Sequence, residues 1–253
     1  MGIQCPTSKL LVRSQPNGRA ALRLFCFPYA GGSASAFRSW SSYLPASIEV
    51  CAIQPPGRGN LWKEPPYTRL DELVRTLVEV LPPYLDLPFA FFGYSVGALV
   101  SFELARQLAK QYALNPVHLF VASCRAPQLV RSDVSIHDLP GDAFLEGLRH
   151  FKGISEHILE DAATMDFLLP TLRADFALYE TYRYVRNPTL DCPLSVYGGL
   201  QDAQVSRSDL KPWQDVANGR FALQMFPGDH FFLRSARDPL LQAMTNDLVG
   251  FLN

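Results

Sequence analysis

The sequence of 253 residues lacks an excess of charge of either sign. Its 23 basic and 24 acidic residues leave a formal net charge of −1 at pH 7. Such a balance provides no overall positive field to attract a phosphate backbone or an anionic membrane surface. Nucleic-acid and membrane binding are therefore not expected.

Cysteine clusters and long hydrophobic runs are also missing. The five cysteines are scattered, without a CxxC pair or Cys/His groups at metal-ligand spacing. This usage is typical of a reducing compartment, and no metal or cofactor is expected. The longest uncharged run, residues 87–102, is shorter than the roughly 20 apolar residues of a membrane-spanning helix. Residues 1–18 contain no signal-peptide core, so we expect a cytoplasmic protein, with a monomer as the default state.

Six short apolar segments, bounded by Pro, Gly or polar residues, are predicted to be buried strands. They cover residues 22–27, 48–53, 88–93, 117–122, 194–199 and 220–226. Helical patterns at 70–81, 97–111 and 239–252 lie between or after them. This alternation predicts an α/β protein whose mostly parallel sheet carries helices on both faces, within a single domain over residues 1–253.

The alternation stops between about residues 132 and 187, where no strand is predicted. Phe144, Leu148 and Phe151 share one helix face, and similar apolar spacing recurs over 158–169 and 172–179. Three short amphipathic helices are expected there. The insertion has two interpretations: a layer that covers part of the core, or a lid over an active site.

A GxSxG motif, GYSVG at residues 93–97, follows one predicted strand and precedes a predicted helix. The motif alone also occurs by chance in glycine-rich turns. A strand before it and a helix after it are what a nucleophile elbow requires, so Ser95 is the candidate nucleophile. The backbone N–H of Val96, at the helix N-terminus, is a candidate donor to a developing oxyanion.

A serine nucleophile needs a base and an acid. His230 lies in the loop after the last predicted strand, where the chain order Ser, acid, His places the base. Asp202 follows the strand at 194–199 and is the candidate acid, although an aspartate there could simply cap a turn. Asp229 is the rival carboxylate, but adjacent residues on a turn seldom face one another. The other four histidines are more easily interpreted as surface or packed residues.

The oxyanion hole needs a second backbone donor from the loop after an early strand. Residues 27–33, FPYAGGS, contain paired glycines that let the backbone approach a ligand closely, unless they form a mere turn. We assign the second donor to the N–H of Ala30, with Tyr29 shaping the wall.

These motifs together resemble the type II thioesterases, stand-alone editing enzymes of non-ribosomal peptide and polyketide assembly lines. The resemblance covers about residues 22–252 and includes FPYAGGSA (27–34), QPPGRG (54–59), GYSVGA (93–98), LRAD (172–175), YGGLQD (197–202), Trp213 and FPGDHFFL (226–233). It implies an α/β-hydrolase fold with a helical lid. It also implies hydrolysis of acyl groups from the phosphopantetheine arm of acyl or peptidyl carrier proteins.

Four residues depart from the pattern of similar proteins. Tyr29 replaces a frequent His, Leu61 an Arg, Val96 a Met or Leu, and Asp229 a Gly. None of these changes removes a catalytic group, and the last three bear on substrate preference.

The resulting hypothesis is a cofactor-independent serine thioesterase with an acyl-serine intermediate on Ser95. One alternative is a carboxylesterase or lipase that acts on oxygen esters with the same triad. Another is a non-enzymatic binding protein of hydrolase fold, a class that normally lacks one member of the triad.

Overall fold

The computed structural model describes residues 9–130, 134–151, 156–186 and 189–252, and within them seven strands form one sheet in the order β1-β3-β2-β4-β5-β6-β7. Strands β2 to β7 are parallel, and only β1 is antiparallel to its neighbour β3. The strands are β1 (Leu11–Val12), β2 (Leu22–Phe27), β3 (Ile48–Ile53), β4 (Phe89–Tyr94), β5 (His118–Ala122), β6 (Leu194–Gly199) and β7 (Phe221–Phe226).

Some of the sequence predictions lie outside the described residues. They concern residues 1–8, which include Cys5 and begin the N-terminal segment in which no signal peptide is expected. They also concern residues 132–133, 152–155 and 187 of the insertion.

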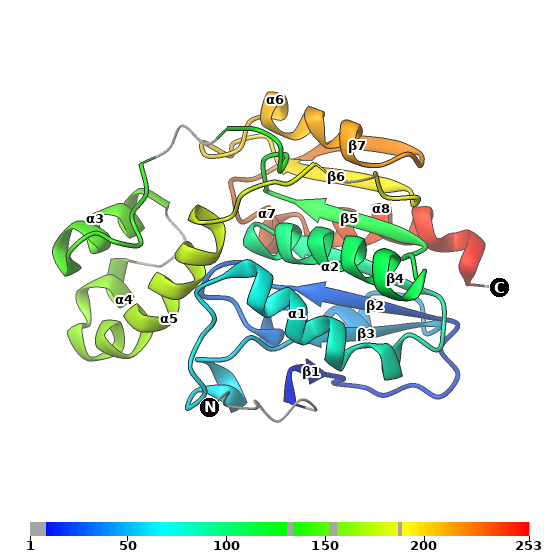
Figure 1. The fold of residues 1–253 in the computed structure, drawn as a ribbon, viewed down its shortest axis with the longest axis horizontal. Coiled ribbons are helices and arrows are strands. Elements are labelled where there is room, and N and C mark those ends of the chain that lie inside the picture. The colour runs from blue at the N-terminus through cyan, green and yellow to red at the C-terminus, as the bar shows by residue number, and fades with distance from the viewer. Residues whose placement is uncertain (1–8, 131–133, 152–155, 187–188, 253) are drawn as a thin grey trace.

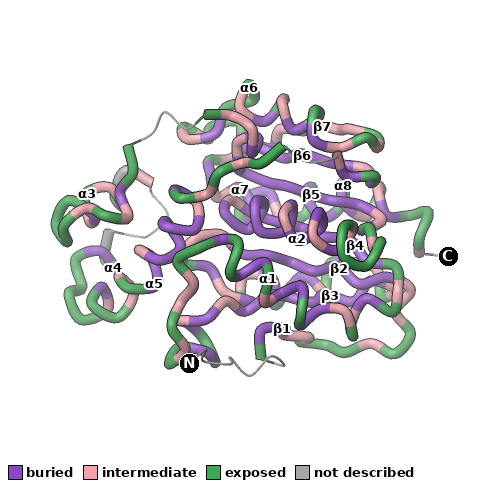
Figure 2. Tube along the Cα trace, viewed as in Figure 1, coloured by how far each residue is buried: buried purple, intermediate pink, exposed green. Residues whose placement is uncertain are grey.

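Every residue of the central strands β2 to β6 is buried, which explains their continuous apolar sequences (Figure 2). The six predicted strands are confirmed to within one residue at each end. The two-residue strand β1 was not predicted, because so short a segment shows no periodicity.

Helices cover both faces of the sheet, as predicted (Figure 1). Helices α1 (Leu70–Val80) and α2 (Val96–Tyr112) pack on one face. Helices α7 (Phe232–Ser235) and α8 (Arg237–Leu248) pack on the other, and the short α6 (Arg207–Leu210) follows β6. The predicted helix at 239–252 corresponds to α8 and a 3₁₀ turn over Val249–Phe251. No helix among the described residues combines the length and the apolar character needed to cross a membrane.

In the described parts of the segment between β5 and β6, three helices lie beyond the carboxyl ends of the parallel strands: α3 (Gly141–Phe151), α4 (Glu156–Glu160) and α5 (Ala162–Glu180) (Figure 1). The predicted boundaries of the second and third helices are wrong. Asp161 adopts an extended conformation, and its side chain accepts a hydrogen bond from the N–H of Thr164. Asp161 therefore caps a helix that starts at Ala162, and the predicted helix across Asp161 is interrupted there. That helix then continues through Pro170.

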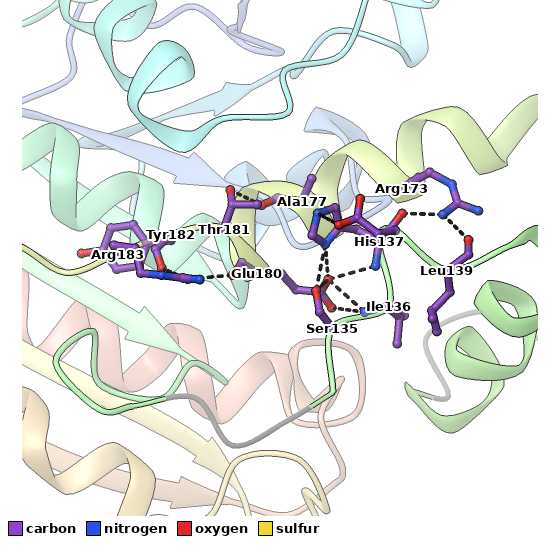
Figure 3. Close-up of polar contacts among 11 residues, drawn as sticks. Ser135, Ile136, His137, Leu139, Arg173, Ala177, Glu180, Thr181, Tyr182 and Arg183 are labelled. Atoms are coloured by element: carbon purple, nitrogen blue, oxygen red, sulfur yellow. Dashed lines mark hydrogen bonds and ion pairs between the residues drawn. The ribbon is translucent and has the colours of Figure 1, made fainter.

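The carboxylate of Glu180, at the end of α5, holds the segment that leads into α3 (Figure 3). It accepts hydrogen bonds from the Ser135 hydroxyl at 2.6 Å and from the Ile136 and His137 amides at 3.0 and 2.9 Å. Burial opposes the charge of Glu180, but these hydrogen bonds outweigh it and lower the pKa of the carboxyl group. Arg173 donates to the carbonyls of His137 and Leu139, so α5 is held to this segment at two points.

A buried histidine should make the stability of the fold depend on pH. Nε2 of His118 lies 2.9 Å from Oγ of Ser195, which donates to Asp247 on α8 at 2.6 Å. Burial, against the attraction of Asp247, lowers the pKa of His118 to about 4. Between pH 6.5 and 4 the unfolded chain therefore binds a proton that the folded chain does not. We expect the free energy of unfolding to fall by up to about 3 kcal/mol as the pH drops through this window.

Urea unfolding of the wild type and of His118→Gln at several pH values from 7 to 4 checks this expectation. The difference in unfolding free energy between the two proteins should change steadily across the window, while His157→Gln, at an exposed position, should follow the wild type. A constant difference between the wild type and His118→Gln would contradict the expectation.

Candidate active site

Ser95 lies at a sharp turn between β4 and α2. Its backbone has φ 53° and ψ −122°, a strained conformation for a residue with a side chain. The N–H of Ser95 donates to the carbonyl of Ala122 on β5 at 2.8 Å. A Cβ atom at Gly97 would lie 2.3 Å from the carbonyl oxygen of Phe27, so only glycine allows this close approach of α2 to the loop after β2. The predicted elbow geometry is thus present.

The structure brings the three predicted side chains together from three segments of the chain. His230 Nδ1 lies 2.8 Å from Asp202 Oδ2, and His230 Nε2 lies 3.4 Å from Ser95 Oγ. Because an ionised carboxylate only accepts, Nδ1 carries the proton and Nε2 is left as an acceptor toward the serine. The 3.4 Å separation is long, as is common in free enzymes, where such contacts tighten on substrate binding.

Asp202 and Asp229 lie in different surroundings. The side chain of Asp202 is fully buried, and its Oδ1 accepts hydrogen bonds from the amides of Gln204 and Val205 at 2.8 and 3.1 Å. Asp229 is exposed, and its Oδ1 accepts from the amide of Phe231 within its own turn. The carboxylate that contacts the imidazole is therefore that of Asp202.

Two further residues hold the histidine loop and were not singled out in the sequence. The hydroxyl groups of Tyr94 and Ser123 donate to the backbone carbonyl of His230 at 2.6 and 3.0 Å. Burial is the main cause that raises the pKa of Tyr94, so the phenol stays protonated and remains a donor. In the sequence, each of these residues is a polar side chain at the carboxyl end of a buried strand. That placement could have identified them as residues near the site.

A cavity of about 90 Å³ opens beside Ser95. The loop after β2, the elbow, helices α3 and α5 and the two loops that carry Asp202 and His230 contribute its walls. The lining residues are Tyr29, Ala30, Ser95, Val96, Ser123, Leu148, Phe151, Leu172, Asp175, Phe176, Tyr179, Gln204, Val205, His230 and Phe231. Most of them are apolar, so the cavity suits an acyl chain.

Both predicted oxyanion donors line this cavity. Within the described residues, the N–H groups of Ala30 and Val96 donate to no protein acceptor. Val96 is the first residue of α2, where backbone N–H groups have no partner in the helix and the helix dipole is positive. Ala30 and Val96 therefore stay candidates for the two oxyanion donors.

The structure shows the surroundings of the other residues that depart from the pattern of similar proteins, Tyr29, Leu61 and Val96. The Tyr29 hydroxyl accepts a hydrogen bond from Arg234 at 3.0 Å, and the Tyr29 ring packs edge-on against Phe231. Leu61 is buried in the same core cluster as the apolar residues of α1. Val96 lines the cavity, which fits an effect on substrate preference.

No metal site is formed in the described part of the chain, where His, Cys, Asp and Glu side chains make no group of three or more able to hold an ion. The four described cysteines, Cys26, Cys51, Cys124 and Cys192, are buried. They lie away from the cavity lining, so the described cysteines do not contribute a nucleophile to it.

Comparison with known proteins gives a consistent family. The model of the thioesterase domain family matches residues 22–248. The chain is 43% identical over 241 residues to the gramicidin S biosynthesis protein GrsT of Aneurinibacillus migulanus, covering 95% of this chain and 94% of the relative. It superimposes with a TM-score of 0.84 on the type II thioesterase BorB from the borrelidin biosynthetic cluster, at 31% identity and over 94% and 96% of the two chains. The sheet and its helices thus form the predicted α/β-hydrolase fold.

A third relative is named as a dehydrogenase, not as a thioesterase. The linear gramicidin dehydrogenase LgrE of Brevibacillus parabrevis is 42% identical over 248 residues, which cover 97% of this chain and 94% of the relative. Dinucleotide-binding turns carry GxGxxG between a strand and the helix that follows it, whereas this chain has FPYAGGSA after β2 and an elbow serine after β4. The family model, the solved structure and the site chemistry agree: the chain belongs to the thioesterase family, hydrolases of thioester bonds, and within it to the type II thioesterases associated with non-ribosomal peptide and polyketide biosynthesis.

Proposed function

We propose that this protein removes acyl groups from the phosphopantetheine arm of acyl or peptidyl carrier proteins through an acyl-serine intermediate on Ser95. The observation that carries the proposal is the Ser95–His230–Asp202 arrangement at the wall of an apolar cavity. The likeness to enzymes of peptide and polyketide biosynthesis supports a carrier-bound substrate. The partner is then a carrier protein, and the chain needs no cofactor of its own.

In the first half-reaction, Oγ of Ser95 attacks the thioester carbonyl carbon while Nε2 of His230 takes the hydroxyl proton. Asp202 holds the proton on Nδ1 and stabilises the imidazolium that forms. The amides of Ala30 and Val96 bind the negative oxygen of the tetrahedral intermediate. Collapse of the intermediate breaks the C–S bond, and His230 returns the proton to the departing pantetheine thiolate.

In the second half-reaction, a water molecule replaces the thiol. His230 takes a proton from the water as its oxygen attacks the acyl-Ser95 ester. The same two amides bind the second tetrahedral intermediate. When the C–O bond to Ser95 breaks, His230 protonates Oγ and the free acid leaves.

Matched substrates test the choice of leaving group. The same acyl chain is offered as an acyl-pantetheine thioester on a carrier protein, as acyl-coenzyme A and as an oxygen ester. We expect the highest kcat/KM with the carrier-bound thioester. A preference for the oxygen ester would support the carboxylesterase or lipase alternative instead.

We further propose that the insertion at about 132–187 acts as a lid within a single domain and shapes the acyl pocket. Helix α3 contributes Leu148 and Phe151 to the cavity, and α5 contributes Leu172, Phe176 and others. Phe144 and Met165 are buried inside the insertion and are absent from the described residues that line the cavity. The two groups of side chains should therefore respond differently to truncation.

Phe176→Ala should raise the rate for long acyl chains relative to short ones by about tenfold. Removing the ring enlarges the apolar cavity, and the added space can hold the end of a longer chain. Met165→Ala serves as a matched control, since it creates a cavity inside the insertion that the substrate does not reach. Hydrolysis of short, medium and long acyl carriers and the melting temperature are measured for both variants. A uniform loss across chain lengths in Phe176→Ala, in proportion to a lower melting temperature, would contradict the lid proposal.

A further inference from the structure

Two sequence motifs that the triad does not use, QPPGRG (54–59) and LRAD (172–175), meet inside the protein. The guanidinium of Arg58 binds the carboxylate of Asp175 on α5 with two hydrogen bonds, Nη2 to Oδ1 at 2.7 Å and Nη1 to Oδ2 at 2.5 Å. Both side chains are at most 10% exposed. The pair is thus a buried, two-pronged ion pair between segments more than a hundred residues apart in the sequence.

The same two side chains hold the loop that carries Ala30. The N–H of Gly31 donates to Oδ2 of Asp175 at 2.7 Å, and Nη1 of Arg58 donates to the carbonyl of Gly32 at 3.1 Å. Gly31 has a positive φ of 75°, and a Cβ atom there would lie 2.8 Å from Cδ2 of Leu172. Helix α5 therefore packs directly on this loop, and the ion pair fixes the two residues that follow Ala30.

Helix α5 is itself held in place. Arg173 and Glu180 on this helix bind residues 135–139, as described above (Figure 3). The N–H of Gly31 therefore meets a carboxylate on a firmly anchored helix.

The charge of Asp175 also matters to the reaction. Asp175 lines the cavity together with Ser95 and Ala30, so an unpaired carboxylate would repel a negative oxygen formed there. The guanidinium of Arg58 neutralises it. Since like charges in a site with little water repel strongly, Arg58 should contribute more to the rate than its hydrogen bonds alone.

We propose that Asp175 and Arg58 are positioning residues of the oxyanion hole: Asp175 fixes the loop that presents the Ala30 amide, and Arg58 cancels the charge of Asp175. This inference rests on the proposed function, because it takes Ala30 as an oxyanion donor. It makes a prediction that the triad alone does not make: removing the charge of Asp175 should partly restore an enzyme that has lost Arg58.

The test compares Arg58→Gln, Asp175→Asn and the double variant with an acyl-pantetheine thioester as substrate. We expect Asp175→Asn to lower kcat by about 10- to 100-fold and Arg58→Gln by about 100- to 1,000-fold, with KM changed by less than about threefold. The double variant should be faster than Arg58→Gln. Arg58→Lys keeps the charge without the two-pronged contact, so its kcat should lie between those of the wild type and Arg58→Gln.

Glu49→Gln is the matched control, because it breaks another buried ion pair. Glu49 on β3 is fully buried and lies 2.9 Å from Nε of Arg23, away from the cavity. It should lower the melting temperature without changing kcat by more than about twofold. The control separates loss of fold stability from loss of oxyanion binding.

The affinity of an inhibitor is a measurement that would not change if Arg58 and Asp175 had a purely structural role. A trifluoromethyl ketone adds to Ser95 and forms a negative oxygen in the oxyanion hole, whereas the matching alcohol has no carbonyl carbon for Ser95 to attack and only occupies the pocket. In Asp175→Asn, affinity for the ketone should fall by about the same factor as kcat, and affinity for the alcohol should stay within about threefold.

Three results would overturn the inference. They are an unchanged kcat in Asp175→Asn, a double variant slower than Arg58→Gln, or equal losses of affinity for the ketone and the alcohol. Failure of the proposed function looks different: the wild type would not hydrolyse the thioester, or Ser95→Ala would remain active.

Discussion

Ser95→Ala is expected to lower turnover of an acyl carrier by about 10⁶-fold, the loss typical when a triad serine is removed. Without Oγ no acyl-enzyme forms, and water would have to attack the thioester directly. The fold should be unaffected, because the Ser95 side chain caps no helix and the smaller alanine fits the same turn. Single-turnover rates and melting temperatures of both proteins give the comparison.

Ser101→Ala on the same helix is the control for this variant. Ser101 is buried, and its hydroxyl donates to the carbonyl of Ala98 within α2 rather than to the cavity. It should retain wild-type activity and react with a fluorophosphonate probe, whereas Ser95→Ala should not react. If Ser95→Ala kept more than about a hundredth of the wild-type rate, Ser95 would not be the nucleophile.

Asp202→Asn is expected to lower kcat by about 10⁴-fold. An amide fills the same space, but its NH₂ group would face Nδ1 of His230 and shift the imidazole proton to Nε2. The imidazole could then no longer accept the proton of Ser95. The effect should be large because Asp202 is fully buried and water cannot substitute for its carboxylate.

Asp229→Asn provides the contrast for this prediction. Its carboxylate is exposed and binds only the amide of Phe231 among the described contacts, so kcat should change by less than about threefold. Rates for both variants are measured with the same substrate. A larger loss in Asp229→Asn than in Asp202→Asn would show that the wrong acid had been assigned.

The sequence predicted the sheet well because its strands are buried on both faces. Such strands are continuous apolar runs that end at Pro, Gly or polar residues, and β2, β3 and β6 match their predicted bounds. The triad could be proposed for a related reason: in this fold the nucleophile, acid and base follow strand ends in a fixed chain order, here the ends of β4, β6 and β7.

Features that depend on contacts between distant segments could not be predicted in the same way. The anchoring of His230 by Tyr94 and Ser123 joins residues that are far apart in the chain. The pairing of Arg58 with Asp175 likewise spans 117 residues. Helix boundaries in the insertion were missed because apolar spacing continues across Asp161, whose capping hydrogen bond starts a new helix.

The most direct test of the proposed function follows both proteins by mass. The enzyme is mixed with a carrier protein loaded with acyl-phosphopantetheine, the reaction is quenched at intervals, and the intact masses of enzyme and carrier are measured. We expect the carrier to lose the acyl mass while the enzyme transiently gains it on the peptide that contains Ser95, and we expect Ser95→Ala to gain none. A carrier that keeps its acyl group, or that loses it equally fast with Ser95→Ala, would contradict the acyl-serine mechanism.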